Sequence, residues 1–261
     1  MPAHRQPLSV AIITLNAASQ LEACLQSVRF AEEIVVVDSG STDGTIALAE
    51  RYGARVIQQD WLGFGPQKQF AVEAAQHDWV LCLDADERVT PALQVAIETA
   101  LQPSSTVEPV AGAFRFPRCN RFLGRYLKHG EGYPDRSLRL FDRRQAAWSA
   151  DAVHEKVEAR CAVADLSADL LHDSAESLAS YLGKQNRYTS LAAEMALAAG
   201  KRASIGRLVF SPLIRFIKFY LIRQGFRDGL PGLIHILIGC FNSFCKYAKM
   251  LERQKSDATL R

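Results

Sequence analysis

Short apolar runs alternate with amphipathic segments through the first hundred residues. Residues 8–15 (LSVAIITL), 33–38 (EIVVVD) and 79–84 (WVLCLD) are continuous apolar runs of strand length, and residues 54–58 (ARVIQ) form a shorter one. Between and after them, helical periodicity predicts helices over residues 18–29, 45–53, 66–77 and 90–102. This alternation predicts an α/β fold with a Rossmann-like, mostly parallel sheet that has helices on both faces.

The pattern changes after a loop at residues 102–109. We expect a strand and a turn over residues 112–124, a strand over 136–144, and a loop followed by a strand over 146–159. Beyond Ser174 the chain is expected to be helical to its end.

Acidic residues follow two of the buried strands directly. Asp38 ends one strand and Asp84 another, and ligands of parallel sheets bind outside the carboxyl ends of the strands. Asp86 completes a D-x-D pair, which can hold a hard divalent cation together with phosphate oxygens and water. An isolated D-x-D is also typical of a solvated turn, but its place after a buried strand favours a cation site.

The stretch DSGSTDGT, residues 38–45, has two further features. Asp38 can accept a hydrogen bond from a base or a ribose hydroxyl, and the turn at Gly40 lets the backbone approach a ligand closely. Asp43 is expected to be the N-cap of the following helix. The stretch is neither G-x-G-x-x-G nor a P-loop, so neither NAD nor ATP bound by Walker A is indicated.

Four segments together resemble the family-2 glycosyltransferases of GT-A fold: residues 9–28, 33–45, 63–87 and 135–158. The resemblance covers roughly residues 8 to 160. Within that family the chain most resembles bacterial lipopolysaccharide-core glucosyltransferases, which add glucose to the inner-core heptose, and this narrower likeness continues through residues 170–194.

The resemblance implies a metal-dependent inverting hexosyltransferase. Its donor would be a UDP-sugar, for which UDP-glucose is the favoured interpretation. Its acceptor would be a lipid-linked saccharide such as lipopolysaccharide inner core. Another envelope polysaccharide or lipid acceptor is the alternative. The GT-A domain would span residues 1–172, with a nucleotide-sugar half at 8–102 and an acceptor half at 110–172.

The resemblance also implies roles for individual residues. The nucleotide-sugar site is expected to contain Thr14, Leu15, Asn16, Asp38, Lys68 and Asp84. Asp86, Asp84 and His172 would ligate Mg²⁺ or Mn²⁺. A departing nucleoside diphosphate gains negative charge, which a metal ion and a nearby Lys or Arg can neutralise.

The general base is expected among the acids of the second half. Many relatives carry a Glu-Asp pair there, whereas this chain has AVHEKV, so Glu155 is the candidate base and Asp135 the alternative. His154 would orient Glu155 or ligate the metal, although a structural role is the alternative for each histidine. Arg136 belongs to a basic, aromatic segment at residues 118–141, expected to meet an anionic acceptor or else to form a solvated loop.

Residues 173–261 form the expected C-terminal helical region. Met195 to Arg227 contains seven Lys and Arg and no Asp or Glu, beside abundant aliphatic and aromatic residues. No apolar run reaches the ~18–20 residues of a spanning helix. We therefore expect interfacial helices on an anionic membrane surface, the alternative being a helical subdomain with a basic surface.

The composition and the first residues bear on the partner, the state of the cysteines and the compartment. A net charge of +3 does not indicate a nucleic-acid partner, and six cysteines without a C-x-x-C pair are expected to be free thiols. The first residues lack the apolar core of a signal peptide, so we expect a cytoplasmic protein, peripheral on the inner face of the cytoplasmic membrane. A sugar nucleotidyltransferase would show a glycine-rich stretch where TLNAAS stands, and a catalytically silent membrane-binding scaffold would not need the D-x-D acids.

Overall fold

The computed structural model describes residues 5–103, 111–151, 155–174 and 177–259. The chain divides into two compact units. The first, here called the sheet unit, comprises residues 1–119 and 135–173. The second, the helical unit, comprises residues 120–134 and 174–261.

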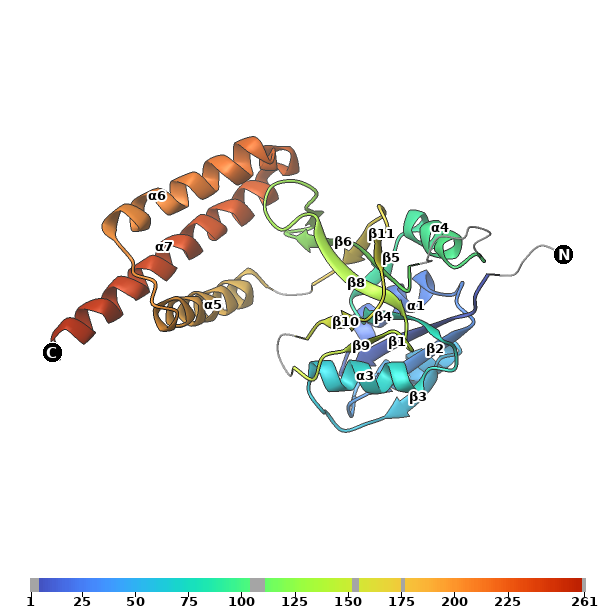
Figure 1. Cartoon of the computed structure of the whole chain (residues 1–261). Helices are drawn as coiled ribbons and strands as arrows, with labels where there is room; N and C mark the ends of the chain where they lie inside the picture. The colour runs from blue at the N-terminus through green and yellow to red at the C-terminus, as the bar shows by residue number, and fades with distance from the viewer. Residues whose placement is uncertain (1–4, 104–110, 152–154, 175–176, 260–261) are drawn as a thin grey trace. The chain divides into compact units, whose positions relative to one another are not determined.

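The first half of the sheet unit alternates strands and helices, as Figure 1 shows. Its elements are β1 (Leu8–Thr14), α1 (Ala18–Ser27), β2 (Glu33–Asp38), α2 (Thr45–Arg51), β3 (Arg55–Gln58), α3 (Phe64–Ala74), β4 (Trp79–Asp84), β5 (Glu87–Val89) and α4 (Pro91–Ala100). Each strand and helix expected before residue 103 is present, and the α/β fold is confirmed. Thr90 caps α4 as expected, because its side chain accepts a hydrogen bond from Leu93 N.

Further strands follow residue 112; most of them extend the same sheet, and two form a separate pair. They are β6 (Ala113–Phe122), β7 (Arg125–Tyr126), β8 (Asp135–Asp142), β9 (Ala146–Trp148), β10 (Val157–Ala159), β11 (Val163–Asp165) and β12 (Leu170–His172). The strand order is β3-β2-β1-β4-β8-β6-β12-β5. The first four strands are parallel, β8 is antiparallel to β4 and β6, and β9 and β10 form a separate antiparallel pair.

Both faces of β1, β2 and β4 are buried, which explains their largely apolar sequences. Side chains that alternate along β1, β2 and β4 enter two separate clusters. One cluster packs Val10, Ile12, Val36 and Leu81 against helices α1, α2 and α4. The other packs Ala11, Val35, Val37 and Cys82 against α3 and the strand β9.

The strand register aligns the acids that end the strands. Thr14 pairs with Asp38 across β1 and β2, and Ile13 pairs with Asp84 across β1 and β4. The two aspartates therefore lie along one edge of the sheet, at the carboxyl ends of its parallel strands.

The helical unit contains α5 (Leu178–Ala198), α6 (Ile205–Phe216), a π-helical turn η1 (Ile217–Ile222), a 3₁₀ turn η2 (Gly225–Asp228) and α7 (Gly229–Thr259). Helix α7 packs against both α5 and α6 (Figure 1). One cluster of buried apolar residues in this unit consists of Ala193, Ala196, Ala203 and Met250. All six cysteines of the chain are free thiols, as expected.

Candidate functional site at the carboxyl edge of the sheet

The carboxylate of Asp38 organises the turn that follows β2. Its Oδ1 accepts hydrogen bonds from the backbone N–H groups of Gly40 (3.0 Å) and Ser41 (2.7 Å). Its Oδ2 accepts from the hydroxyls of Thr14 (2.7 Å) and Ser41 (2.5 Å). Burial acts to raise the pKa of Asp38, but these hydrogen bonds outweigh it and hold the pKa below its usual range.

The end of β1 is tied to the same turn. Asn16 has a left-handed backbone (φ 50°), its N–H donates to Ser41 Oγ at 2.8 Å, and its Oδ1 accepts from Thr42 N at 2.9 Å. Leu15, between the buried Thr14 and Asn16, keeps 56% of its surface exposed. The structure thus brings together four of the residues expected to line a nucleoside.

The carboxylate of Asp43 accepts hydrogen bonds from backbone N–H groups at the starts of α1 and α2, although Asp43 is not the N-cap of α2. That position is Gly44, and α2 begins at Thr45, two residues after Asp43. The Asp43 Oδ1 atom reaches past Gly44 to accept from Thr45 N at 3.0 Å, and Oδ2 accepts from Ala18 N at 3.2 Å. The expectation of an N-cap was therefore wrong by one residue, because the carboxylate caps from outside the helix.

Lys68 bridges two carboxylates at the centre of the site. Its Nζ lies 3.0 Å from Asp84 Oδ1, at the end of β4, and 3.0 Å from Glu155 Oε1, shortly before β10. The lysine comes from α3 and is only 6% exposed. One ammonium group thereby joins Asp84, which was expected to contact the donor, to Glu155, which was expected to act as the base.

A second cation, Arg139 of β8, completes the cluster. Its Nη2 lies 2.9 Å from Asp84 Oδ2 and 3.0 Å from Glu87 Oε1. The indole of Trp148 lies against both cations, with its ring centroid 4.8 Å from Lys68 Nζ and 5.5 Å from Arg139 Cζ. Nε and Nη1 of Arg139 are buried and have no hydrogen-bond partner among the described residues, so the cation–π contact with Trp148 offsets part of the cost of burying the guanidinium.

Burial and ion pairing oppose each other in this cluster. Burial acts to raise the pKa of Asp84, but Arg139 and Lys68 hold it well below its usual range. For Glu87, burial dominates and the pKa is raised, although Arg139 counteracts it. Burial would lower the pKa of Arg139, but the carboxylates of Glu87 and Asp84 raise it further. The site therefore keeps Asp84 anionic and Arg139 cationic throughout the physiological range.

The second acid of the D-x-D pair has a different partner. Asp86 lies in the turn between β4 and β5, and its Oδ2 is 3.2 Å from Nε2 of His172. The pairing of β12 with β5 brings His172 there, since His172 is opposite Glu87 in the register. Two neighbouring ligands at about 2.1 Å from an octahedral cation are themselves about 3.0 Å apart, so this spacing fits a shared divalent ion.

The side chains of Asp86 and His172 suit a divalent cation, but two protein ligands do not complete its coordination. Asp86 and His172 are 25% and 21% exposed, so both are accessible from the rim. No group of three or more His, Cys, Asp or Glu in the described part of the chain converges on one point. Mg²⁺ and Mn²⁺ often use one or two protein carboxylates and take further ligands from phosphate and water. The residues present thus fit a cation that is bound together with a diphosphate.

A basic cavity of about 480 Å³ adjoins Lys68 and Glu155. Its lining includes the side chains of Arg115, Arg118, Arg136, Arg139 and Trp148. The Nη1 atom of Arg136 lies 3.1 Å from Asp165. The alternative base Asp135 is not among the lining residues.

Asp135 is engaged in an ion pair beside this cavity. Both Nε (3.1 Å) and Nη2 (2.9 Å) of Arg118 donate to its Oδ2. Between the two candidate bases, Glu155 is the one that faces Lys68. His154 lies outside the described residues.

Sequence reasoning did not single out Glu87, Arg139, Trp148 or Gln67. Arg139 carried a signal, because it is two residues before the buried Phe141 on the same face of β8, where an apolar residue is the norm. Gln67 is fully buried and its Nε2 donates to Ser39 Oγ at 3.0 Å, which links α3 to the Asp38 turn. Trp148 carried no comparable signal, since its role depends on β9 packing under α3.

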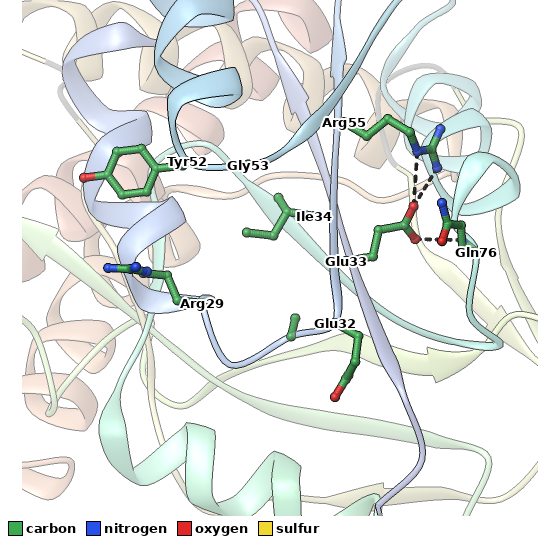
Figure 2. Close-up of a pocket in the computed structure, with 9 residues that line it drawn as sticks. Arg29, Glu32, Glu33, Ile34, Tyr52, Gly53, Arg55 and Gln76 are labelled. Carbon is green, nitrogen blue, oxygen red and sulfur yellow. Dashed lines mark hydrogen bonds and ion pairs between the residues drawn. The ribbon is translucent and has the colours of Figure 1, made fainter.

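A second hollow, of about 340 Å³, lies at the amino end of β2, and Figure 2 shows its lining. Arg55 and the backbone N–H of Gln76 converge there on the carboxylate of Glu33, at 2.7 Å each. Ser9 Oγ donates to the same carboxylate. Because Glu33 has its hydrogen bonds from the protein itself, we interpret this network as structural.

Comparisons with known proteins show the family of the chain. The sequence model described as Glycosyl transferase family 2 matches residues 9–153, more than half of the chain. The lipopolysaccharide core biosynthesis glycosyltransferase LpsC of Rhizobium meliloti is 33% identical over 97% of this chain and 94% of its own length. An uncharacterized glycosyltransferase of Rickettsia bellii is 30% identical over 94% of this chain and 86% of its own length.

The solved structures that resemble this chain include the following two. Staphylococcus aureus TarS 1–349 in complex with UDP gives a TM-score of 0.49 at 14% identity, covering 96% of this chain and 92% of that one. Glucosyl-3-phosphoglycerate synthase of Mycobacterium tuberculosis, in complex with Mn²⁺, UDP and phosphoglyceric acid, gives 0.46 at 18% identity, covering 76% and 80%.

The sequence comparisons show a glycosyltransferase, and its mostly parallel α/β sheet is of the kind expected for the GT-A fold. Within that class, the chain belongs to glycosyl transferase family 2.

Proposed function

We propose that this glycosyltransferase moves a hexose from a UDP-sugar, UDP-glucose by preference, to a lipid-linked saccharide with inversion at the anomeric carbon. Lipopolysaccharide inner core is the proposed acceptor, and the name of the Rhizobium meliloti relative supports it. The carrying observation is the bridge from Asp84 through Lys68 to Glu155. It places a donor-side acid, a cation and a candidate base in continuous contact.

The donor would bind along the edge where β1, β2 and β4 end. Asp38 holds the Ser39–Gly40–Ser41 turn in place, and Leu15 offers an exposed apolar surface next to it. A nucleoside placed there would direct its diphosphate towards Asp84 and Asp86. In this proposal Asp38 acts mainly by shaping the turn, since its own oxygens accept from the protein.

Asp86 and His172 would hold Mg²⁺ or Mn²⁺, with Asp84 close by. When bound, the cation would supply Lewis-acid neutralisation of the diphosphate. The chain itself adds Lys68, whose ammonium lies beside Asp84 and can interact with the charge that develops on the leaving group.

Glu155 would take the proton from the acceptor hydroxyl. Its carboxylate borders the basic cavity and contacts Lys68, so an acceptor in the cavity would lie between the donor edge and this carboxylate. General base catalysis of this kind contributes typically about 10²–10⁴-fold in rate. The arginines of the cavity, Arg118 and Arg136 among them, would recognise anionic groups on the acceptor.

The helical unit would attach the enzyme to the inner face of the cytoplasmic membrane. Eighteen of its large apolar residues between Leu178 and Phe244 are exposed, including Ile205, Val209, Phe210 and Ile214 of α6. The unit carries 17 Lys and Arg against 6 Asp and Glu, whereas the sheet unit carries 14 against 22. An apolar surface with a basic excess suits anionic lipid.

The contacts between the helices support the same interpretation. Polar side chains join α7 to its neighbours: Lys249 Nζ donates to Asn186, Thr189 and Ser190, and Ser211 is 2.7 Å from Ser243. The stretch Gly225–Lys255 is, by length and composition, the one candidate membrane span in the described residues, with a mean hydropathy of 1.2 over its best window, 22% of which is buried. The sequence analysis expected no spanning helix, and by length and composition this stretch departs from that expectation, although Asn242 and Ser243 interrupt its apolar run.

A donor panel on a defined acceptor tests the proposal. The purified full-length protein, with Mn²⁺, is incubated with UDP-glucose, UDP-galactose or UDP-N-acetylglucosamine and lipopolysaccharide truncated at the inner-core heptose. We expect UDP release and a mass increase of one hexose with UDP-glucose. Absence of transfer and of any ligand-induced thermal shift with all three donors would contradict it and favour a silent scaffold. Retention of the donor's anomeric configuration would overturn the inverting mechanism alone.

A further inference from the structure

An open cavity of about 330 Å³, lined by both polar and apolar surface, lies within the helical unit, between α5, α6 and α7. Hydroxyl, amide and ammonium groups line it; among them are Tyr188, Thr189, Ser211, Asn242, Ser243 and Lys246. The same helices also carry exposed apolar residues, among them Leu191, Phe210, Leu213 and Phe244. A cavity with both polar groups and apolar surface, on helices that also expose apolar side chains, suits a ligand with both characters.

Hydrogen bonds between the helices fix the walls of this cavity. Asn242 Nδ2 donates to Gln185 Oε1 at 2.8 Å, which joins α7 to α5. The hydroxyls of Ser211 and Ser243, 2.7 Å apart, join α6 to α7. Another polar residue of the wall, Arg215, is paired with Glu131 of the same unit. The cavity is therefore formed by the unit's own packing.

Lys246 is the group that lacks a matching anion. It is half-buried, and its Nζ lies 5.7 Å from the ring centroid of Tyr247. It makes no ion pair with any acidic side chain within residues 5–103, 111–151, 155–174 and 177–259. Withdrawing an ammonium group from water costs free energy unless an anion compensates, so the site favours an anionic ligand.

We propose that this cavity binds the phosphate-bearing headgroup of a membrane lipid. The phosphate would pair with Lys246 and accept hydrogen bonds from the hydroxyls of Tyr188, Ser211 or Ser243. The acyl chains would lie along the exposed apolar side chains of α6 and α7. The volume is at the lower end of the ~300–1,000 Å³ that ligand cavities occupy, which suits a small headgroup such as phosphoglycerol.

This inference goes beyond the transfer reaction and stands whether or not that proposal holds. It also differs from general attraction to an anionic membrane surface, because it predicts a stoichiometric and saturable site. A lipid bound there would hold the helices together and orient the unit on its membrane.

The test uses the full-length protein and a lipid in monomeric form. Dihexanoyl phosphatidylglycerol is titrated below its critical micelle concentration, with dihexanoylglycerol and glycerol 1-phosphate as probes of the two halves of the molecule. Isothermal titration calorimetry should show one saturable site for the phospholipid and much weaker binding of either half. Equal affinity for glycerol 1-phosphate would overturn the lipid assignment.

Variants separate the cavity from the surface. Lys246→Gln should weaken binding by about ten-fold to a hundred-fold, the usual effect of losing a charged hydrogen bond. Lys246→Arg should retain most of the affinity. Lys184→Gln, an equal change of charge at an exposed position of α5, should bind as the wild type does.

Circular dichroism without lipid checks that all three variants are folded. If Lys246→Gln and Lys184→Gln bind the phospholipid equally well, the cavity is not the site. If Lys246→Gln fails to fold, the proposal rests on Ser243→Ala, which should weaken binding by a smaller factor than a lost charge pair and leave the helical content unchanged.

Discussion

Lys68 Nζ lies at the same distance, 3.0 Å, from Asp84 Oδ1 and from Glu155 Oε1. These carboxylates come from opposite halves of the sheet unit, and Glu155 is 87 positions from the lysine along the chain. One nearly buried ammonium group therefore connects the donor edge to the cavity where an acceptor would bind. Any change at this lysine should affect both.

Replacement of Lys68 by methionine should lower kcat by about 10²–10³-fold, the usual effect of removing a group that stabilises developing charge in the transition state. Methionine keeps much of the length of the side chain while removing the ion pairs with Asp84 and Glu155. Initial rates of UDP release at saturating donor measure the effect. Arg51→Met removes a cation from the exposed surface of α2 and is the matched control. An unchanged kcat in Lys68→Met would show that the bridge has no role in turnover.

Glu155→Gln should lower kcat by about 10²–10⁴-fold while leaving the affinity for UDP unchanged, because the amide cannot take the acceptor's proton. Asp135→Asn should mainly raise the KM for the acceptor, since Asp135 orients Arg118 at the edge of the basic cavity. Acceptor titrations at saturating donor separate the two effects. The base assignment is reversed if Asp135→Asn loses kcat and Glu155→Gln keeps it.

Removal of divalent metal should abolish transfer, and Mg²⁺ or Mn²⁺ should restore it. Asp86→Asn should eliminate the thermal shift that Mn²⁺ and UDP together produce, since it loses the charge of a proposed ligand. His172→Gln should raise the Mn²⁺ concentration needed for half-maximal activity, because one of two proposed protein ligands is weakened. Full activity after chelation would rule out the metal site. If Asp86→Asn loses activity but keeps the wild-type thermal shift with Mn²⁺ and UDP, Asp86 has a structural role only.

Asp38 should make the stability of the sheet unit depend on acid pH. Its folded-state pKa is lowered, so the native state holds fewer protons than the unfolded state, and the resulting stability is complete above about pH 4, the usual value. This contribution is lost as the pH falls through the lowered pKa. Denaturant unfolding at pH 6 and at pH 3.5 should therefore show a smaller decrease for Asp38→Asn than for the wild type. At pH 6 the variant should be less stable by about 1–3 kcal/mol, because two hydroxyl donors lose a charged acceptor.

Asp60→Asn, on the exposed loop after β3, provides the control and should follow the wild-type profile. If Asp38→Asn and the wild type lose the same stability on acidification, the hydrogen bonds at the Asp38 turn do not carry the effect.

The parallel part of the fold could be predicted because its signals are local. Continuous apolar runs such as IVVVD mark strands buried on both faces, and the residue that ends each run lies at the sheet edge in any parallel arrangement. That reasoning correctly placed Asp38 and Asp84 on one edge. It also found Thr90 at the start of α4, since capping depends only on neighbouring residues.

The contacts that complete the site depend on long-range pairing, which the sequence does not encode locally. The strand β12 has three residues and pairs with β5, also of three residues, so neither has a usable periodicity. His172 was identified from resemblance alone, while its distance from Asp86 follows from this register. Arg139 lies in the segment 118–141, which was expected to meet an anionic acceptor or to form a solvated loop, and the pairing of β8 with β4 brings it beside Asp84.

The attachment of the helical unit to lipid can be tested by a charge on its apolar surface. Val209 of α6 is 56% exposed, and Val95 of α4 in the sheet unit is 62% exposed, so the two valines are matched in size and accessibility. Val209→Glu should weaken binding to phosphatidylglycerol vesicles by at least about ten-fold. Removing a valine from lipid costs about 1.5 kcal/mol, and a carboxylate near an anionic surface adds about 1 kcal/mol. Val95→Glu should bind as the wild type does, because the proposal gives the sheet unit no contact with lipid.

Sedimentation with vesicles at 50 and 500 mM salt measures the binding of both variants. The basic residues should contribute to binding mainly at the lower salt concentration, and the apolar surface at both. Equal losses in the two variants would indicate a general effect of negative charge and would remove the helical unit as the site of attachment.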